Sequence, residues 1–181
     1  MNGETTSKFS QLMNTLSIFR NIKTFIFDVD GVLTNSDILV SEDGSLLRTM
    51  NTRDGYALKA AIEQGYNVII ITGGGSAGVV KRLKNLGILH IYSKVKDKLS
   101  QYQDILAKLD LNMDEVLYMG DDLVDYQVMK QVGLPTCPID AVPEIVSISK
   151  FICSKEGGKG CVREIIEKVL KLNNHWPSQH F

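Results

Sequence analysis

Residues 24–34, Thr-Phe-Ile-Phe-Asp-Val-Asp-Gly-Val-Leu-Thr, decide the fold of this chain. The first four are mostly aromatic or β-branched, and such a run predicts a strand buried on both faces of a parallel sheet. An ionised carboxylate is costly inside a sheet, so we expect Asp28 where the strand ends. Ligands of open α/β sheets bind at that edge. Asp28 and Asp30 would repel each other there, and a hard cation such as Mg²⁺ would relieve the repulsion.

A purely structural explanation of the same residues stays open. An aspartate at a strand end also closes Asx-type turns, and Gly31 would supply the tight bend. The other strand ends of the chain therefore decide between a turn and a reactive site.

Length and composition indicate one globular domain. The chain has 181 residues, of which 44% are hydrophobic and 23% charged, as in an ordinary single domain. The net charge of −1 gives no support for nucleic-acid binding or an anionic membrane surface. No apolar run is long enough to span a bilayer, and residues 1–20 lack a secretory signal pattern. Cys137, Cys153 and Cys161 lack metal spacing, which favours buried free thiols in a reducing cytoplasm.

Strands and helices are predicted to alternate along the chain, which implies a Rossmann-like, doubly wound parallel sheet of the α/β class. An amphipathic helix is expected over 8–20, and a small β-hairpin flap over 37–50 around Asp43-Gly44. The predicted organisation is a helical extension over 1–20, one domain over 21–173 and a tail over 174–181. Further strands are expected at 67–72, 88–92, 115–119, 134–137 and 151–153, and further helices at 57–62, 73–86, 96–109, from Asp122 to Val132, and at 159–171.

Three more strand ends carry residues suited to phosphate chemistry. Thr72 ends the second strand, where its hydroxyl and the next glycine amide could hold a phosphoryl oxygen. Lys98 follows the third strand, and its ammonium could neutralise both a phosphate and an attacking carboxylate. Asp121, Asp122 and Asp125 follow the fourth strand. One aspartate suffices to cap a helix, so the surplus of acids favours a metal site.

A dinucleotide site is an alternative, because Gly73, Gly75 and Gly78 match the fingerprint G-x-G-x-x-G after a strand. That fingerprint needs an acidic residue at the end of the next strand, where this chain has Tyr92-Ser93-Lys94. A nicotinamide-dependent oxidoreductase would reveal itself by cofactor binding in a titration.

Taken in order, these strand ends resemble the four motifs of the haloacid dehalogenase superfamily of phosphohydrolases. The resemblance implies that Asp28 is the nucleophile and a metal ligand. It makes Asp30 the general acid and base, with its main-chain carbonyl on the metal. It also implies that Thr72 and Lys98 bind the phosphoryl group and that Asp121 completes the Mg²⁺ site. Asp125 would lie outside the metal's ligands, and the role of Asp122 stays undecided.

Only a hairpin and a helix fit between Asp30 and Thr72, so the chain has no room for a cap domain. It resembles the capless branch, and within it the group that hydrolyses the 8-phosphate of 3-deoxy-D-manno-octulosonate for lipopolysaccharide synthesis. Many enzymes of that group carry an arginine where this chain has Gly74, and Arg82 is the expected substitute for binding the substrate carboxylate. The resemblance assigns substrate contacts to Asn51, Thr52, Arg53, Asp54, Gly55, Lys59, Gly73, Gly74, Arg82 and Arg163.

Assembly is predicted from the hairpin, whose Ile38, Val40, Leu46 and Leu47 are too apolar for an isolated ribbon. We expect a homotetramer in which residues 157–163 approach a neighbour's site. Two alternatives stay open for the function: the same reaction on a nine-carbon, sialic-acid-like substrate, and a non-catalytic phosphosugar-binding or scaffolding protein.

Overall fold

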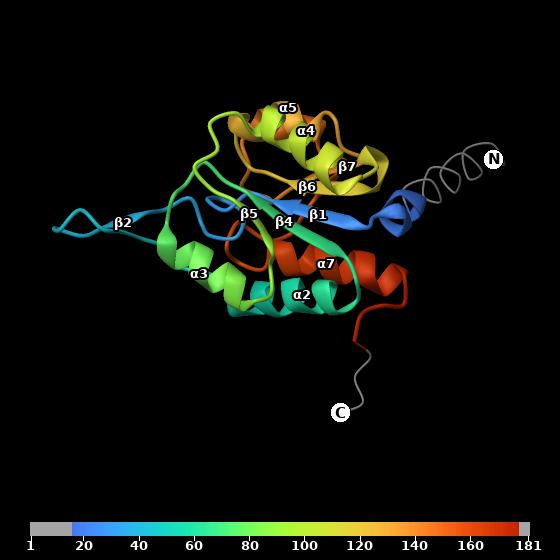
Figure 1. Cartoon of the computed structure of the whole chain (residues 1–181), viewed down its shortest axis with the longest axis horizontal. Coiled ribbons are helices and arrows are strands. Elements are labelled where there is room, and N and C mark those ends of the chain that lie inside the picture. The colour runs from blue at the N-terminus through green and yellow to red at the C-terminus, as the bar shows by residue number, and fades with distance from the viewer. Residues whose placement is uncertain (1–15, 178–181) are drawn as a thin grey trace, which may run out of the picture.

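Six parallel strands form the central sheet of the computed structural model, which describes residues 16–177. The spatial order is β5-β4-β1-β6-β7-β8, so β1 lies between β4 and β6 (Figure 1). The predicted α/β fold with a doubly wound parallel sheet is confirmed. The strands are β1 (Thr24–Phe27), β4 (Asn67–Ile71), β5 (His90–Tyr92), β6 (Val116–Met119), β7 (Leu134–Cys137) and β8 (Phe151–Ile152).

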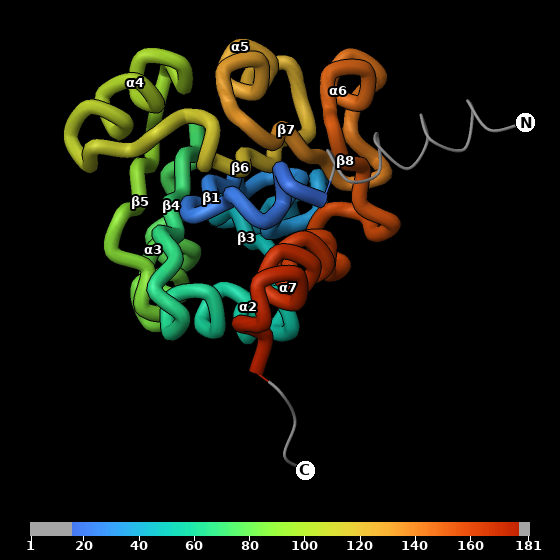
Figure 2. Tube along the Cα trace, turned by 90° about the vertical axis from the view of Figure 1, so that its right-hand side faces the viewer, coloured from blue at the N-terminus to red at the C-terminus, as the bar shows by residue number. Residues whose placement is uncertain are grey.

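Helices cover both faces of this sheet, as Figure 2 shows. One face carries α2 (Thr52–Glu63), α3 (Ala77–Asn85) and α7 (Cys161–Leu172). The other face carries α4 (Lys98–Leu109), α5 (Tyr126–Met129) and α6 (Pro143–Ile148). Two short 3-10 turns, η1 (Met113–Glu115) and η2 (Leu123–Asp125), complete the connections.

Strand β1 is buried on both faces because its side chains alternate between two hydrophobic cores. Phe25 and Phe27 pack in the core beneath α2 and α7, with ring centroids 6.1 Å apart. Ile26 packs in the opposite core, against Tyr118 among others. The chain leaves β1 toward β4 on one side and returns at β6 on the other, so β1 ends at the reversal of strand order. A ligand site is expected at such a switch point.

The predicted hairpin after β1 is also confirmed. Strands β2 (Leu39–Val40) and β3 (Leu46–Leu47) pair in antiparallel fashion and project away from the sheet (Figure 1). Their four side chains are between 50% and 67% exposed. The chain between β1 and β4 holds only this hairpin and α2, so no cap domain covers the sheet edge.

Several element boundaries differ from the prediction. Helix α2 begins at Thr52 and not near residue 57, because the Asn51 side chain accepts a hydrogen bond from Arg53 N at 2.8 Å and caps it. Helix α6 was not predicted, since its six residues give too short an apolar pattern. The helix expected up to Val132 is instead η2 followed by the short α5.

Both ends of the chain are only partly described. Residues 16–21 are helical, while the rest of the helix predicted over 8–20 lies outside the described residues. In the tail, His175 Nδ1 lies 2.9 Å from the Tyr66 hydroxyl, and Trp176 packs edge-on against Tyr56. The proposed domain limits stay predictions. All three cysteines are buried and free, as expected. Between residues 16 and 177, no helix has the length and apolarity needed to cross a membrane.

Candidate active site

The carboxyl ends of β1, β4 and β6 meet at one cavity of about 760 Å³. Residues that follow β5, including Lys98, line it as well, so all four motifs share its wall because parallel strands end at the same edge of a sheet. The cavity is lined by Asp28, Asp30, Thr72, Gly73, Gly74, Lys98, Asp121 and Asp122, with Ser36, Val95, Lys96, Asp97, Leu99, Val124 and Gln127.

Lys98 connects two buried carboxylates at the floor of this cavity. Its Nζ lies 2.8 Å from Asp28 Oδ2 and 2.7 Å from Asp125 Oδ1, and only 5% of its side chain is exposed. Asp125 Oδ1 also accepts a 2.6 Å hydrogen bond from the Tyr118 hydroxyl, and its Oδ2 accepts one from Asp121 N at 3.3 Å. Asp125 therefore has both oxygens bound, and it orients Lys98 and the start of the Asp121 loop.

Burial and mutual repulsion shift the protonation of these groups. Burial, followed by the nearby Asp125 charge, raises the pKa of Asp28 to about 7 although Lys98 opposes the shift. Burial and then the Asp28 charge raise the pKa of Asp121 to about 7 as well. Burial works against the charged form of Lys98, but Asp28 and Asp125 outweigh it and its pKa is raised. Lys98 therefore stays an ammonium at neutral pH.

The acidic group fits a divalent cation. Oxygens of Asp28, Asp121 and Asp125 all lie within 4.8 Å of one another. These three carboxylates and the single Lys98 ammonium leave two negative charges, which one divalent cation would balance. Asp28 Oδ1 and Asp121 Oδ1 are buried and have no hydrogen-bond partner among residues 16–177. Buried unpaired oxygens are rare in proteins and suit a hard cation such as Mg²⁺.

Gly31 lets the loop after β1 approach this acidic group. Its φ is +86°, and a Cβ at this position would lie 1.9 Å from Asp121 Oδ2. Only glycine adopts this backbone conformation at so short a distance from another residue. The Asp-x-Asp-Gly sequence thus places Asp28 near Asp121 and lets the backbone at Gly31 pass against the Asp121 carboxylate.

Arg48 is a site residue that the sequence analysis missed. Its Nε and Nη2 donate to the two carboxylate oxygens of Asp30 at 2.5 and 3.1 Å, and its side chain is only 8% exposed. Thr34 adds a weaker contact to Asp30 at 3.4 Å. No spacing pattern links residue 48 to residue 30, because the pairing depends on the path of the hairpin.

Gly74 makes room for this ion pair. A Cβ at Gly74 would lie 3.1 Å from Asp30 Oδ2 and 3.8 Å from Arg48 Nη2. Gly74 N donates to Thr72 Oγ1 at 3.0 Å, which fixes the hydroxyl at the end of β4. Because Gly74 has no side chain, the Arg48 guanidinium can reach Asp30 close to Thr72.

The glycine run gives no support for a dinucleotide site. Helix α3 begins only after Ser76, whose side chain caps it. Lys94 lies after β5, where a ribose-binding acid is needed, and a Cβ at Gly75 would contact its side chain at 2.8 Å. The glycines serve the turn between β4 and α3.

The remaining predicted substrate residues lie outside the catalytic cavity in this single chain. Asp54 and Gly55 are buried in α2, and Lys59 is exposed and faces Glu63 at 3.7 Å. Arg82 and Thr52 line a separate cavity of about 300 Å³ between the hairpin and α3.

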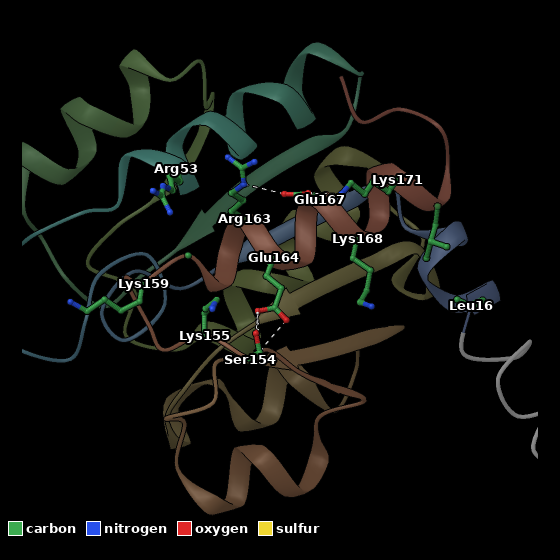
Figure 3. A pocket seen from close by; sticks show the side chains of 12 residues that line it. Leu16, Arg53, Ser154, Lys155, Lys159, Arg163, Glu164, Glu167, Lys168 and Lys171 are labelled. Atoms are coloured by element: carbon green, nitrogen blue, oxygen red, sulfur yellow. Dashed lines mark hydrogen bonds and ion pairs between the residues drawn. The ribbon is translucent and has the colours of Figure 1, made fainter. Parts of the chain in front are cut away.

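Two further predicted substrate residues, Arg53 and Arg163, lie in a groove along α7 together with Lys155 and Lys159 (Figure 3). The volume of this groove is about 840 Å³. Asn51 caps α2 and donates to Gly158 O at 3.5 Å.

Asp122 has a local role. Its side chain caps η2 by accepting from Leu123 N at 2.7 Å, and it is exposed at the cavity rim. It is not part of the acidic group formed by Asp28, Asp121 and Asp125.

Comparisons with known proteins agree with this geometry. Residues 83–165 match the family of haloacid dehalogenase-like hydrolases. The chain is 39% identical over 150 residues to 3-deoxy-D-manno-octulosonate 8-phosphate phosphatase KdsC of Salmonella typhi, covering 83% of this chain and 80% of that protein.

Two solved structures extend the likeness to the whole fold. A HAD superfamily hydrolase (subfamily III A) of Legionella pneumophila is 37% identical with a TM-score of 0.88, covering 92% of both chains. The 3-deoxy-D-manno-octulosonate 8-phosphate phosphatase of Moraxella catarrhalis, solved with magnesium, phosphate and KDO, is 33% identical with a TM-score of 0.87, covering 90% of this chain and 94% of that one. The chain therefore belongs to the 3-deoxy-D-manno-octulosonate 8-phosphate phosphatase family of the haloacid dehalogenase-like hydrolases.

Proposed function

We propose that this protein hydrolyses 3-deoxy-D-manno-octulosonate 8-phosphate to the free sugar acid and phosphate, with Mg²⁺ as cofactor. The observation that carries the proposal is Asp28, whose Oδ2 is held by Lys98 while its buried Oδ1 has no hydrogen-bond partner within the described part of the chain. The reaction would belong to lipopolysaccharide precursor synthesis in the cytoplasm.

Two displacements at phosphorus account for the reaction. A carboxylate oxygen of Asp28 attacks the phosphorus atom, a new O–P bond forms, and the bond to the sugar's terminal oxygen breaks. Asp30 in its protonated form, with one oxygen still accepting from Arg48, donates its proton to the departing oxygen. A water molecule then attacks the aspartyl phosphate, Asp30 accepts its proton, and Asp28 is released with inorganic phosphate.

The residues around Asp28 hold the phosphoryl group and the charge. Lys98 keeps one Asp28 oxygen in place and faces the developing negative charge. The Thr72 hydroxyl, which accepts from the Gly74 amide, and the Gly73 amide would contact phosphoryl oxygens. Asp28 and Asp121 carboxylates, with the Asp30 main-chain carbonyl as the family resemblance implies, would hold Mg²⁺, which supplies charge neutralisation at the transferred group. Asp30 is oriented by Arg48.

The sugar acid end of the substrate needs a cation, and Arg82 remains our candidate. Its Nε is buried without a hydrogen-bond partner in the described chain, and Arg48 lines the same cavity. Arg82→Ala should raise KM for the keto acid phosphate far more than for a neutral phosphate ester. The exposed neighbour Lys81 gives the matched control Lys81→Ala. An equal effect on both substrates would assign Arg82 to the phosphoryl group or to the fold.

A nine-carbon 2-keto-3-deoxy sugar 9-phosphate is the second candidate substrate, because no cap closes the cavity and its 760 Å³ sets no strict limit on chain length. A phosphate-release assay decides between the candidates. The eight-carbon and nine-carbon phosphates and a neutral hexose phosphate would be compared with and without Mg²⁺. We expect the eight-carbon substrate to give the highest kcat/KM, and EDTA to abolish turnover. No release from any sugar phosphate would leave a non-catalytic binding protein.

We also propose a homotetramer in which the exposed hairpins pack together and residues 157–163 approach a neighbour's site. Arg53 and Arg163 would then face the neighbour's substrate from the α7 groove (Figure 3). Leu39 and Leu47 are opposite one another in the hairpin, so Leu39→Asp with Leu47→Asp should yield monomers by light scattering. A wild-type chain that is monomeric and fully active would contradict this assembly.

A further inference from the structure

We propose that Gly157 and Gly158 are positioning residues that set the place of the catalytic loop, residues 29–35, and thereby the spacing between Asp30 and Asp121. The loop that precedes α7 lies directly against this segment in the same chain. The inference rests on the proposed function for its activity readout, but its structural readout does not depend on any substrate.

Hydrogen bonds join the two loops. Gly158 N donates to Val32 O at 2.9 Å, and the buried Cys161 thiol donates to the same carbonyl at 3.3 Å. Asn51 Nδ2 reaches Gly158 O at 3.5 Å from the start of α2. The catalytic loop is therefore hydrogen-bonded both to the loop before α7 and to the first residue of α7, which come much later in the chain.

The contact leaves no room for a side chain. A Cβ at Gly157 would lie 2.0 Å from Gly31 O, and one at Gly158 would lie 2.5 Å from Asn35 N. Protein Cβ atoms essentially never approach another heavy atom within 3.0 Å, so an alanine would force the two backbones about 1 Å apart.

Gly31 is enclosed from the other side as well. Its Cα faces Asp121, since a Cβ there would lie 1.9 Å from Asp121 Oδ2. The Gly31 peptide is thus packed between Gly157 and the Asp121 carboxylate. A shift of this peptide would therefore change the position of Asp30, its neighbour in sequence, relative to Asp121.

The loop that carries Gly157 is itself held from behind. Gly157 N donates to Asp140 Oδ1 at 2.9 Å, and Arg163 N in the first turn of α7 donates to the buried Asp54 at 2.7 Å. These hydrogen bonds tie the glycine loop to Asp140 and, through the start of α7, to Asp54 in α2. The catalytic loop is then the side that yields to added volume.

The test is Gly157→Ala compared with Gly65→Ala. Gly65 lies in the turn before β4 with φ +82°, and a Cβ added there would meet no other part of residues 16–177 within 4 Å, so alanine there strains the backbone without touching the catalytic loop. Because a 1 Å misplacement costs about 100-fold in rate, we expect Gly157→Ala to lower kcat by about 100-fold with little change in KM. Amide hydrogen exchange over residues 29–35 should rise. Gly65→Ala should lose thermal stability while keeping its kcat and its exchange over 29–35.

Three outcomes would overturn the inference. The first is that Gly157→Ala changes neither kcat nor the hydrogen exchange of residues 29–35. The second is that Gly65→Ala lowers kcat as much as Gly157→Ala does at the same loss of stability. The third is that Gly157→Ala raises KM and leaves kcat unchanged. If Gly157→Ala does not fold, Asp140→Ala decides, since it removes an anchor without adding volume: raised exchange over 29–35 supports the inference and unchanged exchange overturns it. If the wild type releases no phosphate, the proposed function fails, and exchange alone decides the positioning role.

Discussion

Asp54→Asn should make the protein more stable at pH 8 and slightly less stable at pH 4. Asp54 is only 1% exposed, and burial raises its pKa from 3.8 to about 6 although Arg163 N, Gly160 N and the Arg163 charge lower it. The folded state therefore binds this proton more tightly than the unfolded chain does. The stability linked to that proton is present below the unfolded pKa and is lost as the pH rises through about 6.

The structure sets the size of the effect. The shift from 3.8 to about 6 corresponds to about 3 kcal/mol of unfolding free energy lost by the wild type above pH 7. The asparagine does not titrate, and its Oδ1 can still accept from Arg163 N. Its NH₂ replaces Asp54 Oδ2, which has no partner in the described chain, and an unpaired buried donor costs about 1 kcal/mol. A net gain of about 2 kcal/mol raises Tm by about 4–8 °C for a chain of this size.

Thermal and denaturant unfolding at pH 4 and pH 8 would measure this gain. Asp43→Asn is the matched control, because Asp43 is exposed and its hydrogen bonds with Ser45 lower its pKa. The control should show no gain at pH 8. An Asp54→Asn protein that is less stable than the wild type at pH 8, or equally stabilised at pH 4, would refute the reasoning. A retained kcat would show that Asp54 caps α7 and does not contact substrate.

Three further predictions concern the catalytic cavity. Asp28→Asn should abolish phosphate release without lowering Tm, because it removes the nucleophile and one of the repelling charges; residual turnover within a few-fold of the wild type would contradict its role. Arg48→Ala should lower kcat by about 10- to 100-fold, since a hydrogen bond to a charged group contributes about 1.5–3 kcal/mol. Arg48→Lys should have a kcat between those of the wild type and Arg48→Ala, because lysine cannot donate two parallel hydrogen bonds to Asp30. Lys98→Met should cost about 3–5 kcal/mol in chemical denaturation and remove activity, because it leaves two buried carboxylates unpaired. Lys96→Met, in the wall of the same cavity, should do neither.

The sequence predicted most of the sheet because the buried strands are short apolar runs bounded by turn residues. Phe25, Phe27 and Ile26 lie in two cores as the run implied. The strand ends also predicted that Asp28, Thr72 and Lys98 share one cavity, since the parallel topology alone brings them together. No packing detail was needed for either prediction.

What the sequence could not predict depends on contacts between distant segments. The pairing of Arg48 with Asp30 follows from how the hairpin returns across Gly74. The packing of Gly157 and Gly158 on the catalytic loop of their own chain was likewise not predicted, and it leaves the expected approach of residues 157–163 to a neighbour's site a prediction. Helix α2 starts early because a single capping contact at Asn51 outweighs a weak apolar pattern. Such contacts have no local periodicity to reveal them.

The hairpin connects the surface of the protein to its acid–base chemistry. Strand β3 ends at Leu47, which is 52% exposed, and the next residue is Arg48, whose side chain is almost fully buried against Asp30. Two adjacent residues thus lie on the exposed surface of the hairpin and against the Asp30 carboxylate. Movement of the hairpin would withdraw the guanidinium from both Asp30 oxygens, because a bidentate pair tolerates little displacement. Packing of hairpins in the proposed assembly would therefore hold Asp30 in place from the side of Arg48, in addition to the contacts of its loop with Gly157 and Gly158.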